Sequence, residues 1–301
     1  MSAGDSGKDW TVLELLDWTT NYFDDACIEN PRLNAEVLLG KVLGLERIML
    51  YARFDRQVQP GQRREFRELV KKRADRCPLQ YLLGETEFYG RDFTVTPAVL
   101  IPRPETELVV DKCLEKLPDE AAAYRIADVG TGSGAIAVTL ALERPSAQVL
   151  GTDSSAEALE VAAQNAHRHD VKERVGLLEG ELTEPVEKAL EKAGKKLHLL
   201  VSNPPYIPSD QVDELEPEVR DHEPREALDG GAEGLDFVRK LVHQAGPLLE
   251  SGGWLVLELS EGQADSVREI LQSREAFSRT EAETEVDRSG CERVLAVEKT
   301  K

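Results

Sequence analysis

A glycine-rich turn between a buried strand and a helix constrains the fold of this chain more than any other feature. The apolar run 125–129 leads into Gly130-Thr131-Gly132-Ser133-Gly134, and a helical pattern follows through Leu142. Glycines let the backbone turn sharply and approach a ligand, to which the helix start offers free N–H groups. The spacing differs from the Gly-x-Gly-x-x-Gly of dinucleotide folds because residue 135 is Ala. Alone, the turn also fits a nicotinamide site or a purely structural role.

Beyond residue 124, strand and helix patterns alternate. We expect strands at 125–129, 148–152, 175–178, 197–202, 254–259, 280–286 and 293–297, and helices that include 156–167 and 237–249. A Ser251-Gly252-Gly253 turn is expected before the fifth strand. Strands separated by helices predict an α/β fold with a mostly parallel seven-stranded sheet, covered on both faces, and room for an antiparallel edge strand.

The first 85 residues have the periodicity of helices instead. Their expected apolar faces are Leu13, Leu16 and Thr20; Ala35, Leu38, Leu39 and Val42 after Asn30-Pro31; and Phe66, Leu69 and Val70 after Pro60-Gly61. A β-hairpin is predicted around Gly90-Arg91-Asp92, followed by a helix from Glu105 to Leu117. We therefore expect a small helical bundle at 1–85, and a hairpin linker with the main domain at 86–301.

Charge and cysteine usage restrict the class of protein. Fifty-seven acidic against 37 basic side chains give a net charge of −20, which disfavours stable DNA binding. The exception is the stretch 63–76, where seven basic residues face three acids; it is either a solvated surface or a docking patch. Scattered cysteines, no long apolar window and a polar start at 1–11 predict a cytoplasmic protein without zinc, disulfides or membrane contact.

An acidic residue ends the second expected strand, about twenty residues beyond the turn, where ribose hydroxyls are bound in related folds. This residue is Asp153. A carboxylate there can accept from both hydroxyls of a ribose, although Asp is also a good helix cap for the segment that follows. The turn and the acid together indicate a cofactor that contains adenosine.

The tetrapeptide Asn203-Pro204-Pro205-Tyr206 directly follows the apolar strand 197–202. Ligands of open α/β sheets gather at the carboxyl ends of strands, so the tetrapeptide should face the same crevice as the glycine turn. Two prolines fix the backbone and leave carbonyl acceptors in a rigid array. With the Asn203 side chain and the flat ring of Tyr206, such a site can hold a planar –NH₂ group by both hydrogens.

These motifs resemble those of amino-group methyltransferases, and three further strings narrow the resemblance. They are Pro78 to Gly84, Glu87 to Gly90, and the highly specific Leu100-Ile101-Pro102-Arg103-Pro104-Glu105-Thr106-Glu107. Over nearly its whole length the chain resembles the peptide chain release factor glutamine methyltransferases, the PrmC or HemK family. The resemblance implies a Rossmann-like domain that uses S-adenosyl-L-methionine and yields S-adenosyl-L-homocysteine.

The family assigns roles residue by residue. By resemblance, Gly130 to Gly134 hold the methionine part of the cofactor, Asp153 holds its ribose, and Asn203 to Tyr206 receive the substrate glutamine. Relatives commonly carry Asp and Trp near the adenine, where this chain has Glu181 and Leu182. Glu181 can accept from the adenine amino group, whereas Leu182 cannot stack as an indole would. Asn203 is expected to contact both the cofactor and the substrate.

The implied activity is methylation of the side-chain amide nitrogen (N5) of glutamine in the Gly-Gly-Gln motif of class I release factors, a step that serves translation termination. We expect Asn203 Oδ1 and the Pro204 carbonyl to accept the two amide hydrogens and Tyr206 to complete the catalytic set, without a metal. The alternatives are an N6-adenine nucleic-acid methyltransferase, which would use the same acceptors, and a cofactor-binding or ribosome-associated module without activity. The 1–85 domain is expected to recognise the body of the protein substrate.

Overall fold

The computed structural model describes residues 9–300, which form two compact units. The first unit comprises the chain up to Gly84 together with Pro217–His222. The second comprises Glu85–Glu216 and the chain from Glu223 onward. The helical unit therefore includes a short segment from far along the sequence, just after the Asn-Pro-Pro-Tyr tetrapeptide. Within the described residues, no helix is both long enough and apolar enough to cross a bilayer.

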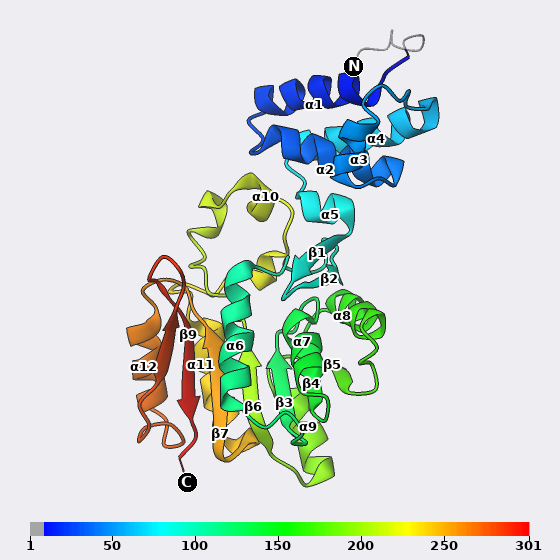
Figure 1. The fold of residues 1–301 in the computed structure, drawn as a ribbon. Coiled ribbons are helices and arrows are strands. Elements are labelled where there is room, and N and C mark those ends of the chain that lie inside the picture. The colour runs from blue at the N-terminus through cyan, green and yellow to red at the C-terminus, as the bar shows by residue number, and fades with distance from the viewer. Residues whose placement is uncertain (1–8, 301) are drawn as a thin grey trace. The chain divides into compact units, whose positions relative to one another are not determined.

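Short amphipathic helices pack around a core that contains Phe23, Leu38 and Phe66 in the first unit (Figure 1). Its helices are α1 (Val12–Asp25), α2 (Pro31–Leu43), α3 (Arg47–Ala52), α4 (Pro60–Ala74), α5 (Leu79–Leu83) and α10 (Pro217–Arg220). Proline opens both α2 and α4, as the Asn30-Pro31 and Pro60-Gly61 signals predict. The short helices α3 and α5 carry too few residues for a periodic pattern to reveal them.

The buried face of α1 differs from the predicted one. Leu13, expected inside, is 37% exposed. The buried stripe consists of Val12, Leu15, Leu16, Thr19 and Phe23. Both stripes have helical spacing, but the observed one carries Phe23 and therefore removes more apolar surface from water.

The basic stretch 63–76 is only partly a surface. Arg73 in α4 is buried, and both of its terminal nitrogens lie 3.1 Å from Glu218 Oε1. Its Nε donates to Asn34 Oδ1 at 2.8 Å, and Arg76 reaches the same carboxylate at 3.3 Å. This cluster attaches the segment 217–222 to the helical unit, so part of the basic run serves its internal structure.

The predicted hairpin is confirmed as the antiparallel pair β1 (Glu85–Phe88) and β2 (Arg91–Thr94). Tyr89 and Gly90 both have positive φ, 52° and 69°, as a two-residue type I′ turn requires. A 3₁₀ turn, η1 (Pro104–Thr106), then leads into α6 (Glu107–Lys116).

The predicted seven-stranded, mostly parallel sheet is also confirmed, in the order β5-β4-β3-β6-β7-β9-β8 (Figure 1). Its strands are β3 (Arg125–Val129), β4 (Gln148–Asp153), β5 (Val175–Glu179), β6 (Leu197–Ser202), β7 (Leu249–Glu258), β8 (Glu283–Val286) and β9 (Glu292–Glu298). Among the described strands of this sheet, antiparallel pairing occurs only between β9 and its two neighbours, β7 and β8. Strand β7 begins earlier than predicted, because residues 251–253 form an irregularity within the strand where its register to β6 shifts.

Helices cover both faces of the sheet, as the alternation predicts. One face is covered by α6, α7 (Ala135–Glu143) and α8 (Ala156–Arg168), and the other by α9 (Glu184–Ala193), α11 (Asp236–Leu248) and α12 (Ala264–Gln272). Neighbouring residues of β3 alternate between the two cores, with Ile126 in the first and Ala127 in the second. The chain reverses its direction of travel across the sheet between β3 and β6, which are hydrogen-bonded neighbours. Ligand crevices of open α/β sheets form at such a point.

Candidate active site

A cavity of about 650 Å³ lies at the carboxyl ends of β3, β4 and β6. Most of the residues that the sequence selected line it: Gly130, Thr131, Gly132, Ser133, Asp153, Glu181, Leu182, Asn203 and Pro205. Gly134, Pro204 and Tyr206 are outside this lining set. Residues separated by more than seventy positions thus meet in one cavity, because parallel strands end at the same edge of the sheet.

The glycine turn is shaped by positive φ angles of 74°, 53° and 77° at Gly130, Gly132 and Gly134. A Cβ at Gly134 would lie 3.1 Å from the Cβ of Ala162, so this glycine lets α7 and α8 pack closely. A Cβ at Gly132 would meet no described atom within 4 Å. Gly134 therefore serves packing, whereas Gly132 keeps backbone exposed to the cavity.

A buried carboxyl supports this turn from below. Asp128 Oδ2 accepts hydrogen bonds from the Thr131 hydroxyl at 2.7 Å and from Ala137 N at 3.2 Å. Among the described residues, Oδ1 has no hydrogen-bond partner. Burial raises the pKa of Asp128 to about 7, against the opposing effect of these hydrogen bonds. The sequence alone gives Asp128 no role beyond its place ahead of the glycine turn.

Asp153 closes the turn from the next strand. Its Oδ2 accepts from Gly132 N at 2.9 Å, and its Oδ1 accepts from Ser155 N at 3.0 Å. The N-cap of α8 is Ser155, whose hydroxyl accepts from Ala158 N at 3.1 Å. Ser155, and not Asp153, is therefore the N-cap residue of α8. Each Asp153 oxygen accepts one backbone hydrogen bond and retains a further lone pair for a ligand.

Glu181 and Leu182 line the cavity just after β5. Leu182 has a positive φ of 50°, and its carbonyl accepts from the Thr152 hydroxyl at 3.0 Å. This bond fixes the backbone at Leu182. The side chain supplies apolar surface there, partly packed against the core of α9 and α11.

Asn203 is held by Thr106, which the sequence identifies only as one letter of a family string. Asn203 Nδ2 donates to Thr106 Oγ1 at 3.2 Å. The same string supplies Arg103, which pairs with the buried Glu223 at 2.6 Å, and Glu107, whose carboxylate accepts from Tyr89 N at 2.7 Å. The Ile-Pro-Arg-Pro-Glu-Thr-Glu string therefore connects the tetrapeptide, the loop that follows it and the hairpin.

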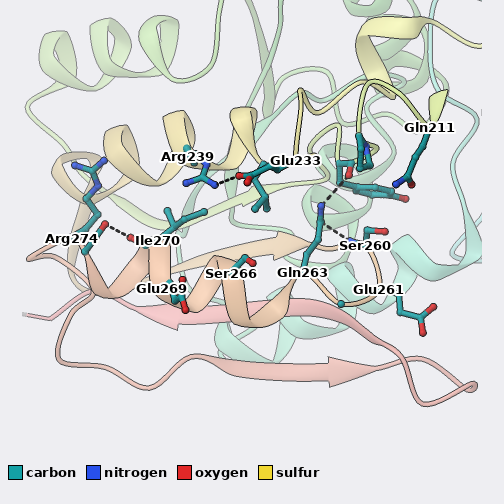
Figure 2. A pocket seen from close by; sticks show the side chains of 15 residues that line it. Gln211, Glu233, Arg239, Ser260, Glu261, Gln263, Ser266, Glu269, Ile270 and Arg274 are labelled. Atoms are coloured by element: carbon teal, nitrogen blue, oxygen red, sulfur yellow. Dashed lines mark hydrogen bonds and ion pairs between the residues drawn. The ribbon is translucent and has the colours of Figure 1, made fainter. Parts of the chain in front are cut away.

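Tyr206 lies in a neighbouring groove of about 730 Å³, lined by residues of α11, α12 and the loops that precede them (Figure 2). Its carbonyl accepts from Gln263 Nε2 at 3.0 Å, and its hydroxyl lies 3.5 Å from Glu258 Oε1. Burial and the nearby Glu258 carboxylate raise the pKa of Tyr206 above its usual range, so the phenol stays protonated near neutral pH. No sequence motif singles out Gln263.

Each of the two units contains a match to a known protein family. Residues 14–84 match the family described as PrmC N-terminal domain, and residues 107–216 match the one described as Methyltransferase small domain. The methyltransferase from Pyrococcus furiosus shares the fold, with 19% identity, a TM-score of 0.51, and coverage of 71% of this chain and 91% of that one.

Curated relatives match over much longer spans. The release factor glutamine methyltransferase of Geobacter sulfurreducens is 46% identical over 286 residues, covering 95% of this chain and 96% of the relative. The protein of the same name from Bacillus subtilis is 38% identical over 288 residues, covering 95% and 96%. Because such identity extends over both units, the chain belongs to the release factor glutamine methyltransferase family.

Proposed function

We propose that this chain transfers a methyl group from S-adenosyl-L-methionine to the side-chain amide nitrogen of the Gly-Gly-Gln glutamine in class I release factors. The observation that carries the proposal is the meeting of Asn203 with the glycine turn and Asp153 in one cavity, within a chain of this family. The cofactor supplies an electrophilic methyl on a sulfonium. The amide nitrogen gains the methyl and releases one of its two protons.

The lining residues fit that cofactor. Gly132 presents open backbone, Asp153 keeps lone pairs for ribose hydroxyls, and Glu181 provides an acceptor for an adenine amino group. Asp128 Oδ1 is a buried oxygen without a partner among residues 9–300, and it lies beneath the same turn. We assign the methionine part to Gly130–Gly134 and the adenine to Glu181 and Leu182.

An amide nitrogen is a poor nucleophile because its lone pair is delocalised into the carbonyl. In the proposed mechanism, Asn203 Oδ1 accepts one amide hydrogen and the Pro204 carbonyl accepts the other, so the lone pair is directed toward the methyl as the nitrogen pyramidalises. Orientation of this kind contributes roughly 7–11 kcal/mol in favourable cases. Pro205 and Tyr206 hold the acceptors in place from within the tetrapeptide.

The test compares wild type with Asn203→Ala, using methyl-labelled S-adenosylmethionine and purified release factor. Methyl transfer should be lost, while calorimetry should show cofactor affinity within a few-fold, because the acceptor serves the transition state. Near-normal turnover of the variant would contradict the acceptor mechanism.

We also propose that the helical unit docks the body of the release factor. Ile48 and Tyr51 of α3, and Phe54 just beyond it, are exposed apolar side chains on this unit. Large apolar side chains that remain exposed often mark interaction sites, and specific docking needs roughly 1,000 Å² of buried area. In the basic stretch, by contrast, Arg73 and Arg76 are already paired with Glu218.

Ile48→Asp combined with Phe54→Asp should raise KM for intact release factor at least about tenfold, while turnover of a short Gly-Gly-Gln peptide should change little. Lys72→Ala is the matched control in the basic stretch. A larger effect from Lys72→Ala than from the double variant would assign docking to the basic stretch instead.

A further inference from the structure

The last residue of the tetrapeptide is held from outside by one glutamine side chain (Figure 2). Gln263 lies between β7 and α12, where it is the N-cap residue of α12. Its Nε2 donates to the Tyr206 carbonyl at 3.0 Å and to the Gly234 carbonyl at 3.2 Å. Its Oε1 accepts from Ser260 N at 3.0 Å. One side chain therefore bridges three separate stretches of backbone.

The partners of Gln263 fix the orientation of its amide. Carbonyl oxygens only accept and a backbone N–H only donates, so Nε2 faces Tyr206 and Gly234 while Oε1 faces Ser260. Both Nε2 hydrogens are used in this way. The side chain makes no capping bond to α12, although Gln263 is the N-cap residue of that helix. Helix capping therefore does not account for a glutamine at this position.

The backbone beside the tetrapeptide approaches it so closely that only glycine fits. A Cβ at Gly230 would lie 2.7 Å from the Pro205 carbonyl oxygen, and a Cβ at Gly234 would collide with the carbonyl oxygen of Tyr206. Gly230 N also donates to the Ile207 carbonyl at 2.8 Å. Two carbonyl oxygens that share one nitrogen partner repel each other, and the N–H groups of the shared amide offset this repulsion. The amide thus joins the two backbones at their closest approach.

A displacement at the end of the tetrapeptide would reach its acceptors. The two successive prolines have fixed φ angles, so the tetrapeptide behaves as a stiff unit. This unit is held at Asn203 by the hydroxyl of Thr106 and at Tyr206 by Gln263. The Pro204 carbonyl lies between the two anchors in the chain. Misplacement of reacting groups by about 1 Å can lower a rate by about 100-fold.

We infer that Gln263 is a positioning residue, which anchors Tyr206 and thereby sets the position of the acceptors on Asn203 and Pro204. The inference rests on the proposed function, because it specifies which side chain outside the tetrapeptide aligns the acceptors for the glutamine amide. Among the described residues, Gln263 is outside the set that lines the cofactor cavity. Its loss should therefore impair methyl transfer more than cofactor binding.

The experiment compares the full-length wild type with Gln263→Met, Gln263→Glu and Gln272→Met. Both substitutions at Gln263 remove the donors and should lower kcat on release factor at least about tenfold, with KM and cofactor affinity within about threefold. Gln272 is the exposed last residue of the same helix, and its substitution should leave kcat within about twofold. Wild-type kcat in Gln263→Met would overturn the inference, as would an equally large loss of cofactor affinity.

The pH profile separates a lost donor from a lost fold. A carboxylate at position 263 repels the Tyr206 and Gly234 carbonyls, whereas a protonated carboxyl regains one donor. Relative to wild type, kcat of Gln263→Glu should therefore rise as the pH is lowered, while that of Gln263→Met should keep a constant ratio. Parallel profiles for the two variants would contradict the proposed role of the donors.

A pair of glycine variants tests the same contact through bulk. Gly234→Ala places a methyl group against the Tyr206 carbonyl, at a positive φ of 70°. Gly194→Ala, at the C-cap of α9, has a similar φ of 62° but no described atom within 4 Å of the added methyl. The first variant should have a kcat at least about tenfold below that of the second. Equal kcat values would overturn the inference.

A last readout does not depend on activity. In protein labelled with ¹³C at the tyrosine carbonyls, the Tyr206 resonance is assigned by its absence in Tyr206→Phe. It should move upfield in Gln263→Met, which removes the hydrogen bond, and should stay in place in Gln272→Met. An unmoved resonance in Gln263→Met would overturn the inference even if methyl transfer fails. Absence of methyl transfer by wild type would count against the proposed function alone.

Discussion

Replacing Arg73 with Ala should destabilise the helical unit by roughly 3 kcal/mol. The buried guanidinium donates to Asn34 Oδ1 at 2.8 Å and holds Glu218 Oε1 at 3.1 Å through both terminal nitrogens. Removing one partner of a buried ion pair costs about 3–5 kcal/mol. The lower end applies because the Glu218 side chain is 21% exposed and keeps Arg76 at 3.3 Å.

Tryptophan fluorescence can follow this unit alone. Of the three tryptophans, Trp10 and Trp18 lie in the helical unit and Trp254 in β7, so a Trp254→Phe background leaves only the first two as reporters. With a urea dependence of about 1–3 kcal/mol/M, the unfolding midpoint of Arg73→Ala should fall by roughly 1–3 M. Arg76→Ala, which removes a more exposed partner of the same carboxylate, should cost about 1 kcal/mol or less. Equal midpoints for the two variants, or an Arg73→Ala midpoint indistinguishable from that of the background protein, would show that the buried ion pair does not stabilise the helical unit in this way.

Two further predictions concern the acidic residues of the glycine turn. Asp153→Ala should weaken S-adenosylmethionine binding by about 1.5–3 kcal/mol through the loss of charge-assisted hydrogen bonds, and unchanged affinity in calorimetry would leave Asp153 only its backbone contacts. Burial raises the pKa of Asp128 from 3.8 to about 7. Protonation of this carboxyl therefore stabilises the folded state, and the contribution is complete below pH 3.8. It is lost as the pH rises toward 7, by up to about 1.4 kcal/mol of unfolding free energy per pH unit. Asp128→Asn should therefore flatten the fall in unfolding free energy between pH 5 and 7, and a urea series that keeps the wild-type slope would contradict this.

The sheet and the meeting of the two motifs could be predicted from the sequence because they depend on long patterns. Apolar runs separated by helices fix a parallel sheet, and parallel strands bring the glycine turn, Asp153 and Asn203 to one edge. The face of α1 could not be fixed in the same way, since two stripes share the helical period. The extension of β7 through residues 251–253 could not be predicted either, because glycines at an irregular position of a strand have the sequence pattern of a turn.

The supporting residues of the site gave no sequence signal of their own. Glu258 is a single acid at the end of an apolar strand, and such an acid usually faces solvent. Thr106 could be recognised only as a letter in a family string, because its hydrogen bond to Asn203 spans 97 positions. The ion pair between Arg73 and Glu218 likewise joins residues 145 positions apart. The basic stretch 63–76, which has the pattern of an exposed surface, is therefore partly buried in the helical unit.

The most direct test of the proposed function is to offer two methyl acceptors to the full chain at once. Methyl-labelled S-adenosylmethionine, a class I release factor and an adenine-containing DNA duplex are incubated together with the protein, and the label is located by mass spectrometry. The proposed function predicts the label on the side-chain nitrogen of the Gly-Gly-Gln glutamine and none on adenine. Label on adenine, or on any other residue of the release factor, would contradict it.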